Sequence, residues 1–101
     1  MGWTMTFARN VGAGIAFLNK NGPKGWKRVV SRAIKEGVFD INSSAHCVLG
    51  EVYGDYWEAK DKLQLFGDRE WLLGFRAYSA DVETLEAAWI AAYKKGLLRD
   101  R

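Results

Sequence analysis

The chain has 101 residues, of which 49% are hydrophobic, and it contains one cysteine and one histidine. A chain of this length forms one domain with one core, and a lone cysteine excludes an internal disulfide. One histidine and one cysteine are too few ligands for an ordinary structural zinc site, so we expect neither a metal nor a cofactor.

The net charge of +3 conceals an uneven distribution along the chain. Residues 1–35 contain seven basic and no acidic side chains, whereas the remainder contains eight basic and all twelve acidic ones. This asymmetry indicates that one face attracts an anion, such as a nucleic acid or an acidic protein. The alternative is that the two halves neutralise each other in the fold.

No apolar run approaches the roughly 20 residues that cross a bilayer. Arg9 and Asn10 lie where a signal peptide would need its apolar region. We therefore expect a cytoplasmic protein that makes no contact with a membrane.

A first helix is predicted from about Thr6 to Lys20, before the break at Gly22 and Pro23. Its apolar stripe consists of Phe7, Val11, Ile15 and Leu18. Another face of this helix carries a small residue at every fourth position, and we expect a second helix to approach closely there, over Ala8, Gly12 and Ala16.

A second helix is predicted from Lys24 to Glu36, with Gly37 as its C-terminal cap. Its outer face is basic, and spacings of four and seven residues keep several of the charges on one side. The candidate anion-binding or nucleic-acid-binding residues are Lys24, Lys27, Arg28, Arg32 and Lys35. A solvated helix face is the simpler explanation, and an anion-binding stripe is the alternative.

The stretch from Ser43 to Trp57 is predicted to be the centre of the fold. Before it, Phe39 and Ile41 lie on the same side of a short extended connector and can plug the core. Ser43 or Ser44 can cap a buried helix with apolar positions at Cys47, Val48, Val52 and Tyr53. Gly50 within this pattern predicts a close contact with another backbone segment.

Three further helices are expected in the second half of the chain. One spans Tyr56 to Leu65, and Asp68 can cap a short one around Trp71, for which a buried extended segment is the alternative. The last is capped by Ser79 or Asp81, and its stripe is Val82, Leu85, Trp89, Ala92 and Tyr93. The predicted fold is all-α, a compact single-domain bundle (1–101) of about five short helices, with residues 1–5 and 97–101 frayed.

Catalysis is not expected from these residues. His46 and Cys47 are neighbours and would point about 100° apart on a helix, so they cannot form the base and nucleophile of a thiol dyad. Glu51 and Asp55 could be an acid/base pair or half of a cation site, although a solvated carboxylate cluster is the simpler explanation. We therefore predict no catalytic residue and a protein that is not an enzyme.

Surplus aromatic residues beside charged ones are typical of a protein interface. The candidate partner-binding patch consists of Trp3, Tyr56, Trp57 and Tyr78. The alternative is that every aromatic side chain belongs to the core. A helix-turn-helix is not favoured, because the second helix of the one tightly joined pair carries as many acidic as basic residues.

Several short sequence blocks resemble those of a protein family. The main ones are Cys47-Val48-Leu49-Gly50, Gly54-Asp55-Tyr56 and Leu73-Gly74-Phe75. From about Gly14 to Tyr93 it resembles a group of small orphan proteins encoded by actinobacteriophages. The resemblance implies a phage or prophage origin and a host-cell cytoplasmic location, and it implies no particular activity. The expected function is binding and modulation of a host or phage protein. The alternative is a nucleic-acid-binding accessory protein that uses the basic helix 24–36.

Overall fold

The computed structural model describes residues 2–99, with side chains from Phe7 onward. In that part of the chain all regular structure is helical, which confirms the predicted all-α fold class. The elements are α1 (Gly2–Asn21), α2 (Trp26–Lys35), α3 (Val48–Tyr53), α4 (Tyr56–Lys62), α5 (Arg69–Leu72), the 3-10 helix η1 (Ser79–Asp81) and α6 (Val82–Lys94).

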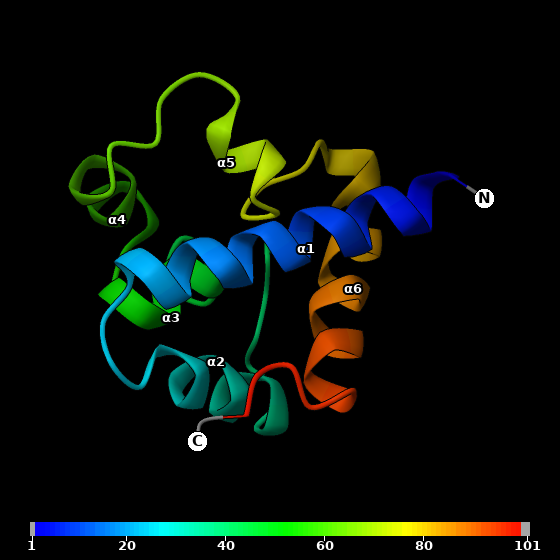
Figure 1. The fold of residues 1–101 in the computed structure, drawn as a ribbon, viewed down its shortest axis with the longest axis horizontal. Helices are drawn as coiled ribbons and strands as arrows, with labels where there is room; N and C mark the ends of the chain where they lie inside the picture. Colours follow the sequence, from blue (N-terminus) through cyan, green and yellow to red (C-terminus); the bar gives the residue numbers. More distant parts are fainter. Residues whose placement is uncertain (1, 100–101) are drawn as a thin grey trace.

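Helix α1 runs across the middle of the molecule, and α6 crosses it at a steep angle (Figure 1). The contact between α1 and α6 is the most extensive between any two helices of residues 2–99. Val11, Ile15 and Leu18 of α1 and Leu85, Trp89 and Ala92 of α6 are buried, as their helical spacing predicts. No helix of the described segment is both long and apolar enough to cross a membrane.

The turn after α5 is held between α1 and α6. A Cβ atom added to Gly14 would overlap the carbonyl oxygen of Leu73, so α1 rests directly on the backbone of this turn. Gly74 has a φ of +72° and turns the chain back. Its carbonyl accepts a 2.7 Å hydrogen bond from the indole Nε1 of Trp89. Phe75 then enters the core, where its ring stacks on Trp89 at a centroid distance of 6.3 Å.

The expected close approach of a helix to Ala8, Gly12 and Ala16 is wrong. All three residues are exposed, and a Cβ atom on Gly12 would meet nothing within 4 Å. The close contact lies at Gly14, which is buried beside Ile15 on the apolar side of the helix. The repeat of small residues therefore marked the solvent-facing side, because the apolar stripe decides which side of α1 is covered.

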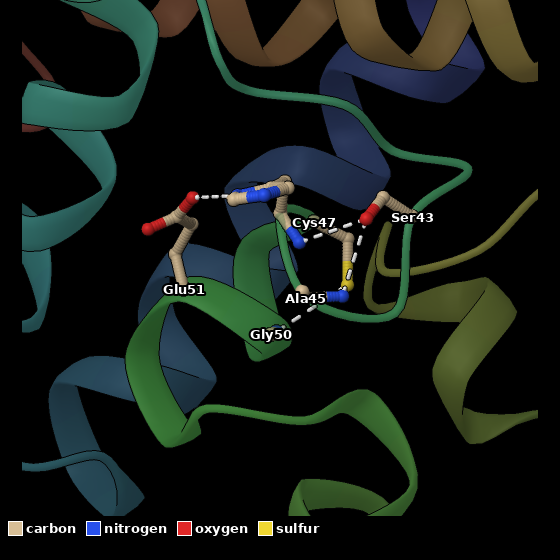
Figure 2. Close-up of polar contacts among 6 residues, drawn as sticks. Ser43, Ala45, Cys47, Gly50 and Glu51 are labelled. Carbon is tan, nitrogen blue, oxygen red and sulfur yellow. Dashed lines mark hydrogen bonds and ion pairs between the residues drawn. The ribbon is translucent and has the colours of Figure 1, made fainter.

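The centre of the chain differs from its prediction in where the helix begins. Cys47, not a serine, is the N-cap of α3, and its Sγ accepts a 3.3 Å hydrogen bond from the amide of Gly50. Ser43 instead stabilises the preceding turn, where its Oγ accepts hydrogen bonds from the amides of Ala45 and His46 (Figure 2). The predicted close contact at Gly50 is confirmed, since a Cβ atom there would overlap the carbonyl oxygen of Ser44.

The ends of several helices also differ from prediction. Helix α1 begins at Gly2, and α4 ends at Lys62, after which Gln64 adopts a φ of +55°. A short helix does form around Trp71, and Asp68 is its N-cap residue as predicted, although the Asp68 side chain makes no capping hydrogen bond. Asp81, one of the two predicted caps, is the N-cap residue of α6, although its side chain makes no capping hydrogen bond, and Ser79 begins η1, which leads directly into that helix.

The segment after α6 packs against the molecule, whereas fraying was expected over 97–101, of which 100–101 lie outside the described residues. Leu98 is 2% exposed, and its carbonyl accepts a 2.9 Å hydrogen bond from the hydroxyl of Ser31 in α2. Figure 1 shows this segment returning beside α2. Phe39 and Ile41 are buried, as predicted for the connector between α2 and α3.

Two glycines of α1 provide a test of this packing. Gly14→Ala should lower the free energy of unfolding by about 1–3 kcal/mol, because the new methyl group displaces the turn at Leu73. Gly12→Ala is the matched control and should raise the free energy of unfolding by up to about 1 kcal/mol, since its methyl group meets open space. Urea denaturation of both variants measures the difference. Equal effects would contradict the packing described for α1.

Candidate functional site

A buried carboxylate connects α5 to its neighbours. Glu70, 2% exposed, is the one fully buried charged residue among those the structure describes. Its Oε2 lies 2.8 Å from the Nζ of Lys60, and its Oε1 accepts a hydrogen bond from the hydroxyl of Tyr56. The Nη1 of Arg76 is 3.5 Å from the same Oε1. Because a buried charge is costly without partners, these contacts determine how α4, α5 and the segment at Arg76 pack together.

Aromatic rings surround the guanidinium of Arg76. Its Cζ lies 5.9 Å from the ring centroid of Tyr56, 5.7 Å from that of Trp57 and 5.8 Å from that of Trp71. The rings of Trp71 and Tyr78 are in contact, with centroids 4.6 Å apart. Cation–π attraction holds such an arrangement together. We call Trp57, Trp71, Arg76 and Tyr78 the Arg76 patch.

The Arg76 patch is accessible to solvent. Trp57 is 55% exposed and Tyr78 is 72% exposed, while the Arg76 side chain is 45% exposed. Trp71 is half-buried beneath them. Large rings exposed together beside a cation are unusual on a free protein surface and are typical of binding sites.

A groove of about 340 Å³ adjoins the Arg76 patch and shares Trp57 and Arg76 with it. The connector before α3, the first turn of α4 and the segment from Phe75 to Val82 form its walls. Arg76 is its one charged lining residue in the described part of the chain, and serine residues line it at Ser43, Ser44 and Ser79. The groove is therefore polar and carries a single positive charge.

The predicted partner-binding residues lie in different environments. Trp57 and Tyr78 lie in the Arg76 patch, 55% and 72% exposed. Tyr56 does not belong to the exposed surface: it is 6% exposed because its hydroxyl donates inward to Glu70. The side chain of Trp3 lies outside the described residues.

Sequence reasoning missed Arg76 and Glu70. Arg76 stands in a segment without helical periodicity, and Glu70 occurs in a charged stretch where carboxylates are normally solvated. The one available signal was that Arg76 lies between Phe75 and Tyr78, a basic residue flanked by aromatic ones.

The candidate anion-binding residues lie on α2 or just before it. Lys24, Arg28, Arg32 and Lys35 are exposed, whereas Lys27 is half-buried. The hydrogen bond from Ser31 to Leu98 brings the end of the described chain to this helix. Three further basic residues occur in that region, namely Lys94, Lys95 and Arg99.

His46 and Cys47 have separate partners. The Nδ1 of His46 lies 2.8 Å from the Oε2 of Glu51, and the His46 side chain is 52% exposed. The Cys47 thiol is buried, and burial raises its pKa above the ordinary value. Figure 2 shows the hydrogen bond between the Cys47 sulfur and the amide of Gly50, and it shows that Glu51 lies away from the sulfur. A protonated, buried thiol is a poor nucleophile.

No three His, Cys, Asp or Glu side chains among the described residues are grouped so that they could hold a metal ion. Comparison of the chain with models of protein families, with curated proteins and with solved structures finds no match. The function must therefore be inferred from the residues of the chain itself.

The buried carboxylate gives a first prediction for this site. Glu70→Gln should lower the free energy of unfolding by about 1–3 kcal/mol, because the amide replaces the charge that Lys60 pairs with. The exposed Glu83 of α6 is the matched control, and Glu83→Gln should change the free energy of unfolding by less than about 0.5 kcal/mol. Thermal and urea unfolding of both variants measure the contrast. A Glu70→Gln variant as stable as the wild type would show that the ion pair is dispensable.

The raised pKa of the Cys47 thiol gives a second prediction for this region, on how stability depends on pH. Above about pH 9, the ordinary pKa of a thiol, the unfolded chain loses the thiol proton while the native protein keeps it. Ionisation then favours the unfolded state, so this contribution to the free energy of unfolding is complete below pH 9 and decreases as the pH rises further, by at most about 1.4 kcal/mol per pH unit. Urea unfolding between pH 8 and pH 10 should show a smaller decrease for Cys47→Ala than for the wild type. Parallel curves would contradict the burial of the thiol.

Proposed function

We propose that this chain is a small non-catalytic protein that binds another protein through the Arg76 patch and modulates it. The observation that carries the proposal is the exposure of Trp57, beside the half-exposed Arg76, and of Tyr78, which packs on the neighbouring Trp71. Tryptophan, tyrosine and arginine are the residues that contribute most binding energy in protein interfaces.

The packing beneath the Arg76 patch supports the same proposal. Trp57 meets Tyr56 edge to face at 5.1 Å, and the Nζ of Lys60 lies 5.6 Å from the Trp57 ring. Tyr56 and Lys60 are in turn held by Glu70. An aromatic side chain that is already ordered in the free protein loses little conformational freedom when a partner binds.

A non-catalytic role is favoured by the state of the reactive groups. The Cys47 thiol is buried and accepts a hydrogen bond from an amide, and His46 is paired with Glu51 instead. Both oxygens of the Glu70 carboxylate have partners within the protein. The resemblance to orphan proteins of actinobacteriophages leads us to place the partner among the phage or host proteins of an infected cell's cytoplasm.

Nucleic-acid binding through α2 is a second candidate function. The observation that favours it is the hydrogen bond from Ser31 to Leu98, which brings a second basic segment to the side of α2. Lysine and arginine side chains gathered in this way neutralise phosphates without regard to sequence. We rank it second because it leaves the exposed Trp57 and Tyr78 without a role.

Capture of a partner tests the first proposal. The tagged protein should enrich one protein from a nuclease-treated actinobacterial lysate, and Trp57→Ala with Tyr78→Ala should weaken that interaction by roughly 10-fold or more. The matched control is Leu97→Ala, which removes an exposed apolar side chain (52%) outside the Arg76 patch and should leave the affinity unchanged. Mass spectrometry identifies the captured protein, calorimetry measures the affinities, and thermal unfolding verifies that each variant is folded.

The two candidate functions differ in their response to charge and salt. Replacing Lys24, Arg32 and Lys35 by glutamate should leave binding of the protein partner nearly unchanged. If nucleic acid is the true ligand, the same changes abolish a DNA mobility shift whose affinity falls steeply with salt. The first proposal would be overturned if the tagged protein captured nucleic acid from an untreated lysate and no protein from a nuclease-treated one.

A further inference from the structure

We propose that the groove beside the Arg76 patch receives a carboxylate of the partner protein. The carboxylate belongs to an extended segment whose neighbouring apolar side chain lies against Trp57. This inference rests on the proposed function and names the chemistry of the partner at the same site.

The charge of Arg76 is available for such a ligand. Glu70 makes its close ion pair with Lys60, at 2.8 Å, and its contact with the Nη1 of Arg76 is longer, at 3.5 Å. Two cations thus surround one buried anion, and this cluster has a net charge of about +1. A guanidinium has five N–H donors, and the contact with Glu70 is made through Nη1. The side chain is 45% exposed and lines the groove.

The guanidinium is also oriented before a ligand arrives. Rings of Tyr56, Trp57 and Trp71 lie within 6 Å of its Cζ from three different positions in the chain. An arginine held in this way loses less side-chain freedom on forming a bidentate bond with a carboxylate.

Serine residues that line the groove contribute hydrogen-bond donors. The Oγ of Ser43 accepts hydrogen bonds from the amides of Ala45 and His46, so its own hydroxyl proton can be donated to a ligand. The hydroxyl groups of Ser44 and Ser79 line the same groove. One arginine with neutral hydroxyl donors matches the single charge and two oxygens of a carboxylate. A doubly charged phosphate is usually bound by several cations.

A displayed library of random peptides selected on the whole protein tests the proposal. Enriched peptides should share one Asp, Glu or free C-terminal carboxylate beside an aromatic or aliphatic residue. For a selected peptide, Arg76→Gln should weaken binding by roughly 10- to 100-fold, and the peptide's own Glu→Gln change by a similar factor. The two changes combined should weaken binding little further, because they remove the same interaction.

Arg69 offers a matched control for the loss of a charge. It is exposed on α5, and its Cζ lies 5.5 Å from the ring of Phe17, outside the groove. Arg69→Gln should leave peptide affinity within about 2-fold of the wild type. If Arg76→Gln does not fold, Arg76→Lys retains the charge but loses the planar fork, and should still weaken binding. On the wild-type protein, the Nε–Hε resonance of Arg76 should shift with the acidic peptide and not with its amide analogue.

The outcomes separate this inference from the function on which it rests. Peptides without a shared acidic position, or peptides that bind Arg76→Gln as well as the wild type, overturn the carboxylate site. The proposed function then survives if Trp57→Ala still abolishes their binding. If the peptides bind the double variant Trp57→Ala/Tyr78→Ala as tightly as the wild type, the proposed function is overturned as well. Tighter binding of a phosphopeptide than of its glutamate counterpart would show that the groove selects phosphate.

Discussion

The buried carboxylate of Glu70 is the constraint on which the surface of this protein depends. Its partners come from α4 and from the segment after α5, so the pairing of one charge brings three separate parts of the chain together. The same contacts draw Tyr56 inward and place Arg76 at the surface among aromatic rings. A stability requirement thus arranges the residues to which we assign binding, and a change at Glu70 would act on the Arg76 patch through its contact with the Arg76 guanidinium.

The turn at Gly74, before Arg76, fixes the path of the backbone. Gly14 lets α1 approach the carbonyl of Leu73, and Gly74 turns the chain so that Trp89 can donate to its carbonyl. Phe75 is thereby fixed in the core, and Arg76 must leave it. The position of the arginine is consequently determined by buried residues from three parts of the chain, Gly14, Gly74 and Trp89.

Much of the architecture could be predicted from periodicity. The stripes of α1 and α6, the plugging residues Phe39 and Ile41, and the close contact at Gly50 all follow from local spacing. The errors have a common cause. The small residues Ala8, Gly12 and Ala16 have the pattern of a helix-packing surface, although the close contact is at Gly14. Ser43 has the residue type of an N-cap, although the N-cap is Cys47. A local pattern states what a residue can do and not which neighbour it meets. Fraying was expected for Leu98 because a bond to Ser31 has no local signal.

The sequence by itself determined the helical class, the composition of the core and the concentration of positive charge in the first third of the chain, since each depends on residue type and spacing along one segment. The tertiary structure alone decided that Trp57 is exposed, that Glu70 is enclosed, and that Arg76 lies between rings from α4 and α5. These properties depend on distances between residues far apart in the chain. Such distances are set by packing and by the cost of leaving a buried charge unpaired.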